Sequence, residues 1–167
     1  ALILDDATPE QALPYYASLA DFVCDGLNEC GYVYCPGGVM AKNPSWRLRQ
    51  KDWHQQFGTW IETPEPQAIL PATIFFDLRA VAGTSSLLEE VQERALERTQ
   101  RQARFMALLA RDALRQQPPL GFFRQFVLRR LGGQEETFDL KQQGLLPVVD
   151  LARCHALEHG VSLVGTQ

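Results

Sequence analysis

The chain has 167 residues, 46% of them apolar and 22% charged, a composition typical of a globular protein with one domain or two small ones. Its net charge of −4 argues against wholesale nucleic-acid binding, and no apolar run approaches the roughly 18–20 residues that span a bilayer. The four cysteines have a spacing that fits no zinc motif, so we expect free thiols and a cytoplasmic location.

The first 31 residues predict a strand followed by a helix. Residues 1–4 are apolar and strand-like, and the pattern from Thr8 to Gln11 is that of a capping box at the start of a helix. Gly31 stands where a left-handed residue would end this helix. A strand that passes directly into a helix favours an α/β layer.

A loop is expected over residues 32–45, followed by a second helix from about Ser45. Trp46, Trp53 and Trp60 are spaced seven residues apart, which would align three rings on one helical stripe. The stripe has two interpretations: a set of packing anchors, or a surface on which a nucleotide base stacks.

Residues 72–81 predict an apolar strand that contains one acid, Asp77. A carboxylate in such a strand is costly to bury unless it is paired or binds a metal ion. Arg79 has the same side-chain parity and could be the ion-pair partner of Asp77. The local sequence leaves both roles of Asp77 open, the structural pair and the site residue.

Helical periodicity dominates from residue 84 onward. We expect one long helix to about Gln116, a short aromatic helix over 121–131 and a last helix over 147–160. His155 and His159 are four residues apart in the last helix, a spacing that could hold a metal ion, but the sequence shows no evident third ligand. The change of pattern near Gly83 divides the chain into predicted domains at 1–83 and 84–167.

Three parts of the sequence together resemble a known family. They are residues 1–6 (Ala-Leu-Ile-Leu-Asp-Asp), residues 35–46 (Cys-Pro-Gly-Gly-Val-Met-Ala-Lys-Asn-Pro-Ser-Trp) with 74–79 (Ile-Phe-Phe-Asp-Leu-Arg), and residues 139–153, which begin Asp-Leu-Lys. In this order they are similar to the nucleotidyltransferase-like domain found behind cyclic-nucleotide-binding and CBS domains in bacterial signalling proteins. That domain is similar to the PII uridylyltransferases and the glutamine-synthetase adenylyltransferases. The resemblance covers nearly the whole chain.

The resemblance implies the end of a polymerase-β-like α/β catalytic layer over 1–83 and an all-α substrate-binding domain over 84–167. Such enzymes carry a Gly-Ser motif, an Asp-x-Asp pair and a third acid on a later strand. The first two are expected upstream of Ala1, and Asp77 matches the third acid, as a metal ligand or as the group that activates the acceptor. Two Mg²⁺ ions held by clustered carboxylates would stabilise the charge that builds on the phosphates. The present residues alone would then be inactive.

The same resemblance suggests residues that meet the nucleotide. Gly37 and Gly38 would allow close backbone approach, and Lys42 and Asn43 would reach phosphate or base, although Pro-Gly-Gly is also ordinary turn chemistry. Arg79 joins this set through the Asp-Leu-Arg segment. Lys141 would meet the triphosphate with Asp139 orienting it, unless these two residues form only a surface pair.

The first functional hypothesis is a metal-dependent nucleotidyltransferase that transfers a uridylyl or adenylyl group from UTP or ATP to an acceptor such as a regulatory protein. The second is a degenerate nucleotidyltransferase that senses nucleotide or binds a protein in signalling, and the third is a helical interaction domain that binds no nucleotide. CBS or cyclic-nucleotide-binding domains are expected in the same full-length chain. Neither nucleic acid nor a membrane is an expected partner.

Overall fold

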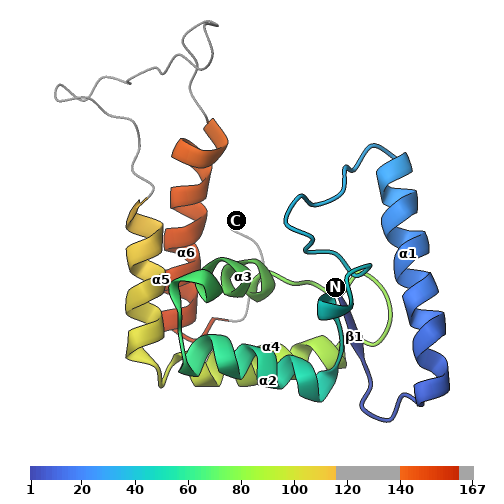
Figure 1. The fold of residues 1–167 in the computed structure, drawn as a ribbon. Helices are drawn as coiled ribbons and strands as arrows, with labels where there is room; N and C mark the ends of the chain where they lie inside the picture. Colours follow the sequence, from blue (N-terminus) through green and yellow to red (C-terminus); the bar gives the residue numbers. More distant parts are fainter. Residues whose placement is uncertain (116–139, 162–167) are drawn as a thin grey trace, which may run out of the picture. The chain divides into compact units, whose positions relative to one another are not determined.

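The computed structural model describes residues 1–115 and 140–161, which are mostly helical and contain one two-stranded parallel sheet (Figure 1). The chain forms two compact units: residues 1–57 with 80–94, and residues 58–79 with the chain from 95 onward. The units interleave along the sequence, and the domain boundary at Gly83 stays a prediction. None of the helices in the described ranges has both the length and the apolar character needed to cross a membrane.

The sheet belongs to the first unit. β1 (Leu2–Leu4), at the predicted position, pairs in parallel with β2 (Arg47–Arg49), with Ile3 opposite Leu48. Trp53 lies just beyond β2 in α2 (Gln50–Glu62), is fully buried, and donates its Nε1–H to the carbonyl oxygen of Leu2 at 3.0 Å. This hydrogen bond attaches β1 to the core of the unit.

α1 (Leu13–Glu29) confirms the first predicted helix, although its start differs from the prediction. A short 3-10 turn (Glu10–Ala12) precedes it, and no side chain caps either element, so the predicted capping box is wrong. The predicted end at Gly31 is confirmed. Its φ is +95°, and the N–H of Tyr32 donates to the carbonyl of Leu27 at 3.0 Å, the bond that closes a left-handed helix end.

The second predicted helix begins later than expected. Residues Pro44–Trp46 form a 3-10 turn and β2 follows, so Trp46 does not lie on α2 with Trp53 and Trp60. Pairing with β1 draws residues 47–49 into a strand, a tertiary effect that overrides local helical spacing. Trp53 and Trp60 are buried, as is Phe57, and packing therefore accounts for these rings.

The predicted strand at 72–81 is wrong. Its first half belongs to α3 (Pro66–Phe76), in which Ile69, Ala72 and Phe75 are buried at a spacing of three residues. The ring of Phe75 stacks on Trp60 with the ring centroids 5.6 Å apart. Pro66 occupies the first helical position, where the missing N–H needs no partner.

The predicted long helix from residue 84 is two helices. α4 (Ser86–Thr99) and α5 (Ala103–Arg115) are separated by residues 100–102. Thr99 is buried and donates its hydroxyl to the carbonyl of Leu96 at 2.7 Å, and the N–H of Gln102 donates to the carbonyl of Thr99. Phe105, on one face of α5, is buried.

The last helix is close to its prediction. α6 (Leu146–Glu158) packs beside α5, and a π-helical segment (Lys141–Leu145) leads into it (Figure 1). Gly160 has a φ of +69°, and the N–H of Val161 donates to the carbonyl of Ala156 at 2.8 Å, so the predicted end is confirmed. The aromatic helix predicted at 121–131 lies outside the described residues.

Candidate functional site

The segment 35–46, called here the glycine loop, contains four of the predicted nucleotide-binding residues. Gly38 has a φ of +67°, a left-handed conformation that favours glycine, and its N–H closes a turn on the carbonyl of Cys35 at 2.9 Å. The side-chain amide of Asn43 donates to the carbonyl of Gly38 at 3.2 Å. The structure therefore brings Gly38 and Asn43 together, with Gly37 in the same turn.

Asn43 also fixes the exit of the glycine loop. Its side-chain oxygen accepts the N–H of Ser45 at 3.1 Å and caps the 3-10 turn that leads to β2. Arg47 adds a hydrogen bond from Nη1 to the carbonyl of Ala41 at 2.9 Å. The nitrogen and the oxygen of the Asn43 amide thus both stabilise the conformation of the loop. This agrees with the alternative raised from the sequence, in which the Pro-Gly-Gly segment is an ordinary turn.

Lys42 points its ammonium group at α1. Its Nζ lies 2.7 Å from Oδ1 of Asp25 and 5.7 Å from the ring centroid of Tyr34. The Tyr34 hydroxyl donates to the same carboxylate oxygen at 2.7 Å. These hydrogen bonds, that of Lys42 first, lower the pKa of Asp25, and the bond to Asp25 raises the pKa of both Lys42 and Tyr34.

The Asp25 carboxyl is expected to titrate below the ordinary aspartate value of about 3.9. Because its pKa is depressed in the folded protein, the contact with Lys42 is intact at neutral pH and is lost as the pH falls through that lowered value. A carboxyl-detected NMR titration measures the midpoint. Lys42→Ala should move it upward and Tyr34→Phe should move it less, whereas an unchanged midpoint in Lys42→Ala would contradict the assigned ion pair.

Asp77 lies in the second unit and differs from its predicted setting. It follows the last turn of α3, rather than lying in a strand, and its side chain is 45% exposed. Its carboxylate accepts hydrogen bonds from Nε and Nη2 of Arg153 on α6, with the Nε contact at 3.3 Å. The partner suggested by strand parity, Arg79, is an exposed residue beyond the end of α3. Asp77 thus has an ion-pair partner, Arg153, that lies 76 residues away along the chain.

Arg153 bridges two carboxylates. Its Nη1 lies 2.6 Å from Oδ1 of Asp150, one turn earlier on α6, and its side chain is only 12% exposed. Burial by itself lowers the pKa of Arg153. The hydrogen bonds and charges of Asp77 and Asp150 together outweigh this effect and raise the pKa, so the guanidinium stays charged. The two carboxylates thus share one cation that is largely, but not fully, covered.

This arrangement does not fit a Mg²⁺ ion at Asp77. Magnesium needs free carboxylate oxygens with room for water and phosphate, whereas both Asp77 and Asp150 face the guanidinium of Arg153. Lys141, a predicted triphosphate contact, is exposed at the start of the π-helical segment. Asp139 lies outside the described residues.

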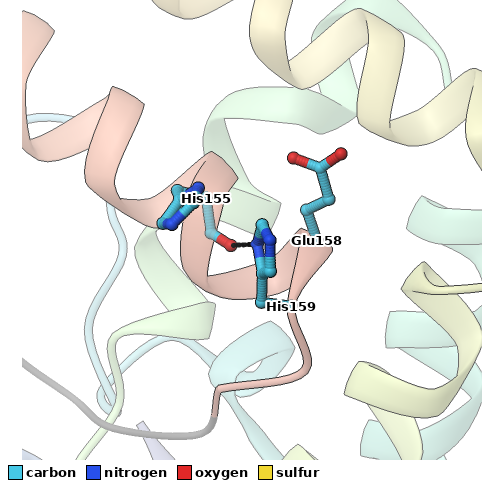
Figure 2. Close-up of side chains that lie close together, drawn as sticks. All are labelled: His155, Glu158 and His159. Carbon is cyan, nitrogen blue, oxygen red and sulfur yellow. Dashed lines mark hydrogen bonds between the residues drawn. The ribbon is translucent and has the colours of Figure 1, made fainter.

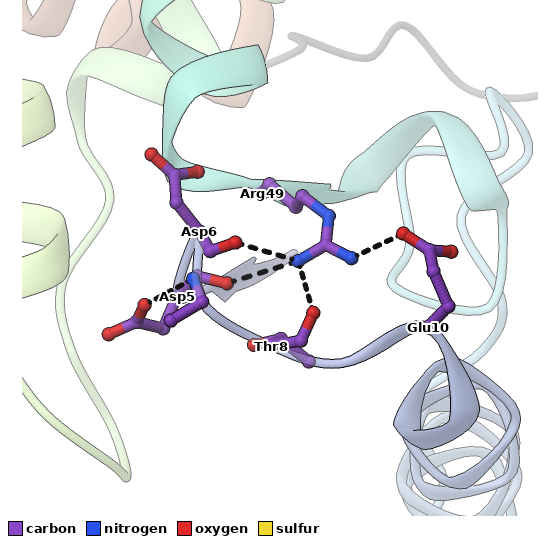
Figure 3. A network of polar contacts seen from close by, with 6 residues as sticks. Asp5, Asp6, Thr8, Glu10 and Arg49 are labelled. Carbon is purple, nitrogen blue, oxygen red and sulfur yellow. Dashed lines mark hydrogen bonds and ion pairs between the residues drawn. The ribbon is translucent and has the colours of Figure 1, made fainter.

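A second cluster, around Arg49, was not recognised from the sequence (Figure 3). Nη1 of Arg49 donates to the carbonyl of Thr8 at 2.6 Å and to that of Asp6 at 3.1 Å, and Nη2 pairs with Glu10 at 2.7 Å. The Asp6 carboxylate accepts the N–H of Lys51 at 3.0 Å, near the start of α2. These bonds hold the turn after β1, so Asp6 has a structural role.

The partners of the predicted site residues could not be identified from the sequence. These partners are Asp25, Tyr34, Asp150 and Arg153. Only the Asp150–Arg153 pair had a local signal, since residues three apart on a helix are neighbours. The other pairs join segments that are distant in the sequence and carry no such pattern.

Comparison with known families supports the functional class suggested by the sequence. Residues 1–67 match the family described as "Putative nucleotidyltransferase DUF294", and residues 103–167 match the one described as "Putative nucleotidyltransferase substrate binding domain". The two matches support the assignment of this chain to the nucleotidyltransferase family. No curated protein and no solved structure gives a significant match to the chain.

Proposed function

We propose that this chain is part of a metal-dependent nucleotidyltransferase that transfers a uridylyl or adenylyl group from UTP or ATP to an acceptor such as a regulatory protein. The observation that carries the proposal is the order of the two family matches, the nucleotidyltransferase family over 1–67 and the substrate-binding family over 103–167. The proposal includes cyclic-nucleotide-binding or CBS domains in the same full-length protein, and a cytoplasmic location.

The glycine loop is the proposed nucleotide contact of the first unit. Lys42 is partly exposed, and within residues 1–115 and 140–161 its ammonium group pairs with the carboxylate of Asp25. A phosphate group offers an ammonium ion the same kind of charged acceptor with more negative charge. Nucleotide binding would therefore transfer Nζ of Lys42 from Asp25 to a phosphate oxygen, while Gly38 leaves the backbone open beside it.

Mg²⁺ belongs to the proposal as the ion that would neutralise phosphate charge, held by the clustered carboxylates that the resemblance implies. Asp77 remains the candidate third acid by resemblance only, and it could ligate a metal only after release from Arg153. Arg79 and Lys141 remain candidate nucleotide contacts by resemblance, without an assigned step.

The Lys42 assignment is tested by calorimetric titration of Mg²⁺-UTP and Mg²⁺-ATP into the full-length protein and its Lys42→Ala variant. Loss of one charge-assisted hydrogen bond should weaken the preferred nucleotide about tenfold, equivalent to about 1.4 kcal/mol. Asp25→Asn, which frees the ammonium, should bind at least as tightly as the wild type. Lys51→Ala is the matched control, since Lys51 is an exposed lysine at the start of α2.

Equal affinity in the Lys42→Ala and Lys51→Ala variants would exclude Lys42 as a phosphate contact. Absence of any nucleotide binding by the full-length wild type would refute the proposed function as a whole.

The second candidate function is a degenerate nucleotidyltransferase that senses nucleotide or binds a protein partner. It is favoured by one observation, the engagement of the Asp77 carboxylate by Arg153. Nucleotide binding without release of pyrophosphate in the presence of candidate acceptor proteins would support this function over catalysis.

A further inference from the structure

We propose that His155, Glu158 and His159, none of which belongs to the proposed nucleotide contact, form a binding site for a divalent transition-metal ion of the zinc class. The three residues occupy positions i, i+3 and i+4 of one helical turn, at the C-terminal end of α6 (Figure 2). One ligand atom from each lies within 4.8 Å of the others. The sequence showed the two histidines, and the structure adds Glu158 as the third ligand.

The ring of His159 is oriented for metal binding. Its Nδ1 lies 2.9 Å from the carbonyl oxygen of His155, as the dashed line in Figure 2 shows. In a neutral imidazole this Nδ1 carries the proton and donates to the carbonyl, which leaves the Nε2 lone pair for a metal ion. Metal-ligating histidines are commonly held in this way, with the second ring nitrogen bonded to a carbonyl or carboxylate.

The donor set selects the class of metal. Two imidazole nitrogens and one carboxylate oxygen suit Zn²⁺ and related transition metals, whereas Mg²⁺ and Ca²⁺ prefer oxygen ligands alone. The rings of His155 and His159 lie with their centroids 4.2 Å apart, so one ion can reach both. All three side chains are exposed, which lets the ion enter directly and leaves its remaining positions to water.

The bound ion would link His155 to His159 across the last turn of α6. It would thereby oppose fraying of the helix just before Gly160, where the chain turns into the left-handed conformation. An ion that binds only the folded helix also raises thermal stability by mass action. The extent to which the last turn of α6 is ordered would therefore depend on the concentration of the metal ion.

The test is a titration of the untagged protein with Co²⁺, a coloured substitute for Zn²⁺, followed by displacement with Zn²⁺. We expect one ion per chain, weak visible d–d bands, and a rise in melting temperature on adding Zn²⁺. His155→Ala and His159→Ala should each raise the dissociation constant at least about tenfold, the lower end of the losses seen on disturbing metal sites. The matched control is His54→Gln, which removes the histidine of α2 and should leave the affinity unchanged.

Free thiols are the competing ligands, because Cys30 and Cys35 are exposed. Strong near-ultraviolet charge-transfer bands would indicate cobalt bound to thiolate and would overturn the proposal. So would equal Co²⁺ affinity in the wild type and in the His155→Ala/His159→Ala double variant. Circular dichroism of each variant establishes that its helices are intact, so that lost binding reports lost ligands. None of these outcomes depends on nucleotide binding.

Discussion

Trp53→Ala is expected to lower the free energy of unfolding by about 3–5 kcal/mol, the range for truncating a large buried aromatic side chain. Trp53 is fully buried, and its ring lies 6.3 Å from the rings of both Trp46 and Phe57. Its removal leaves a cavity and deprives the carbonyl of Leu2 of a hydrogen-bond donor. The loss should therefore affect both the core of the first unit and the attachment of β1.

Urea unfolding followed by far-ultraviolet circular dichroism measures this loss without depending on tryptophan fluorescence. Trp53→Phe retains most of the apolar ring but not the N–H donor, so its destabilisation should be intermediate. Val81→Ala is a control at a side chain that is 87% exposed, where a change within about 0.5 kcal/mol is expected. A loss below about 1 kcal/mol for Trp53→Ala would show that Trp53 is not a central packing residue.

Arg153→Met is expected to destabilise the protein by about 2 kcal/mol. Removal of one partner from a buried ion pair costs about 3–5 kcal/mol, and the 45% exposure of Asp77 reduces this because water can solvate its carboxylate. Methionine preserves much of the apolar stem but leaves Asp77 and Asp150 with no shared cation. At this chain length the melting temperature should fall by about 4–8 °C.

The control for Arg153 is Arg79→Met, which removes the exposed arginine that strand parity had paired with Asp77. Its effect should stay within about 0.5 kcal/mol. A double-mutant cycle with Asp77→Asn and Arg153→Met should give a coupling energy of about 1 kcal/mol. An equal or greater loss in Arg79→Met would favour the ion pair inferred from the sequence over the one in the structure.

Features decided within a few residues could be predicted from the sequence. The ends of α1 and α6 follow from Gly31 and Gly160, because both positions have a positive φ that glycine adopts at low cost. The start of the chain also gave a strand and then a helix in the expected order. In each case the local sequence and the local backbone conformation agree.

The error at residues 72–81 has a physical origin. A short, continuous apolar run looks alike in a buried strand and a buried helix, and periodicity alone does not separate them. Two prolines are compatible with this helix, since Pro66 begins α3 and Pro71 lies within it. In the helix that forms, α3, the ring of Phe75 stacks on Trp60, a residue that lies outside the apolar run.

The partners of the candidate site residues were beyond local reasoning. Lys42 meets Asp25 across 17 residues, and Asp77 meets Arg153 across 76. Such pairs depend on which helices pack together, and single-sequence spacing does not contain that information. The resemblance could indicate which residues matter to a family, but not which neighbour each one contacts.

The π-helical segment before α6 has a geometric consequence. A π-helical turn holds one residue more than the α-helical turn it replaces, and each residue of an α-helix advances the side-chain direction by about 100°. Deleting one residue within 142–145 would let the π-helical segment relax into regular α-helix. Lys141 would then swing about 100° around the helix axis relative to Arg153, with no change in the side chain itself. The extra residue thus sets the direction in which Lys141 projects from this helix.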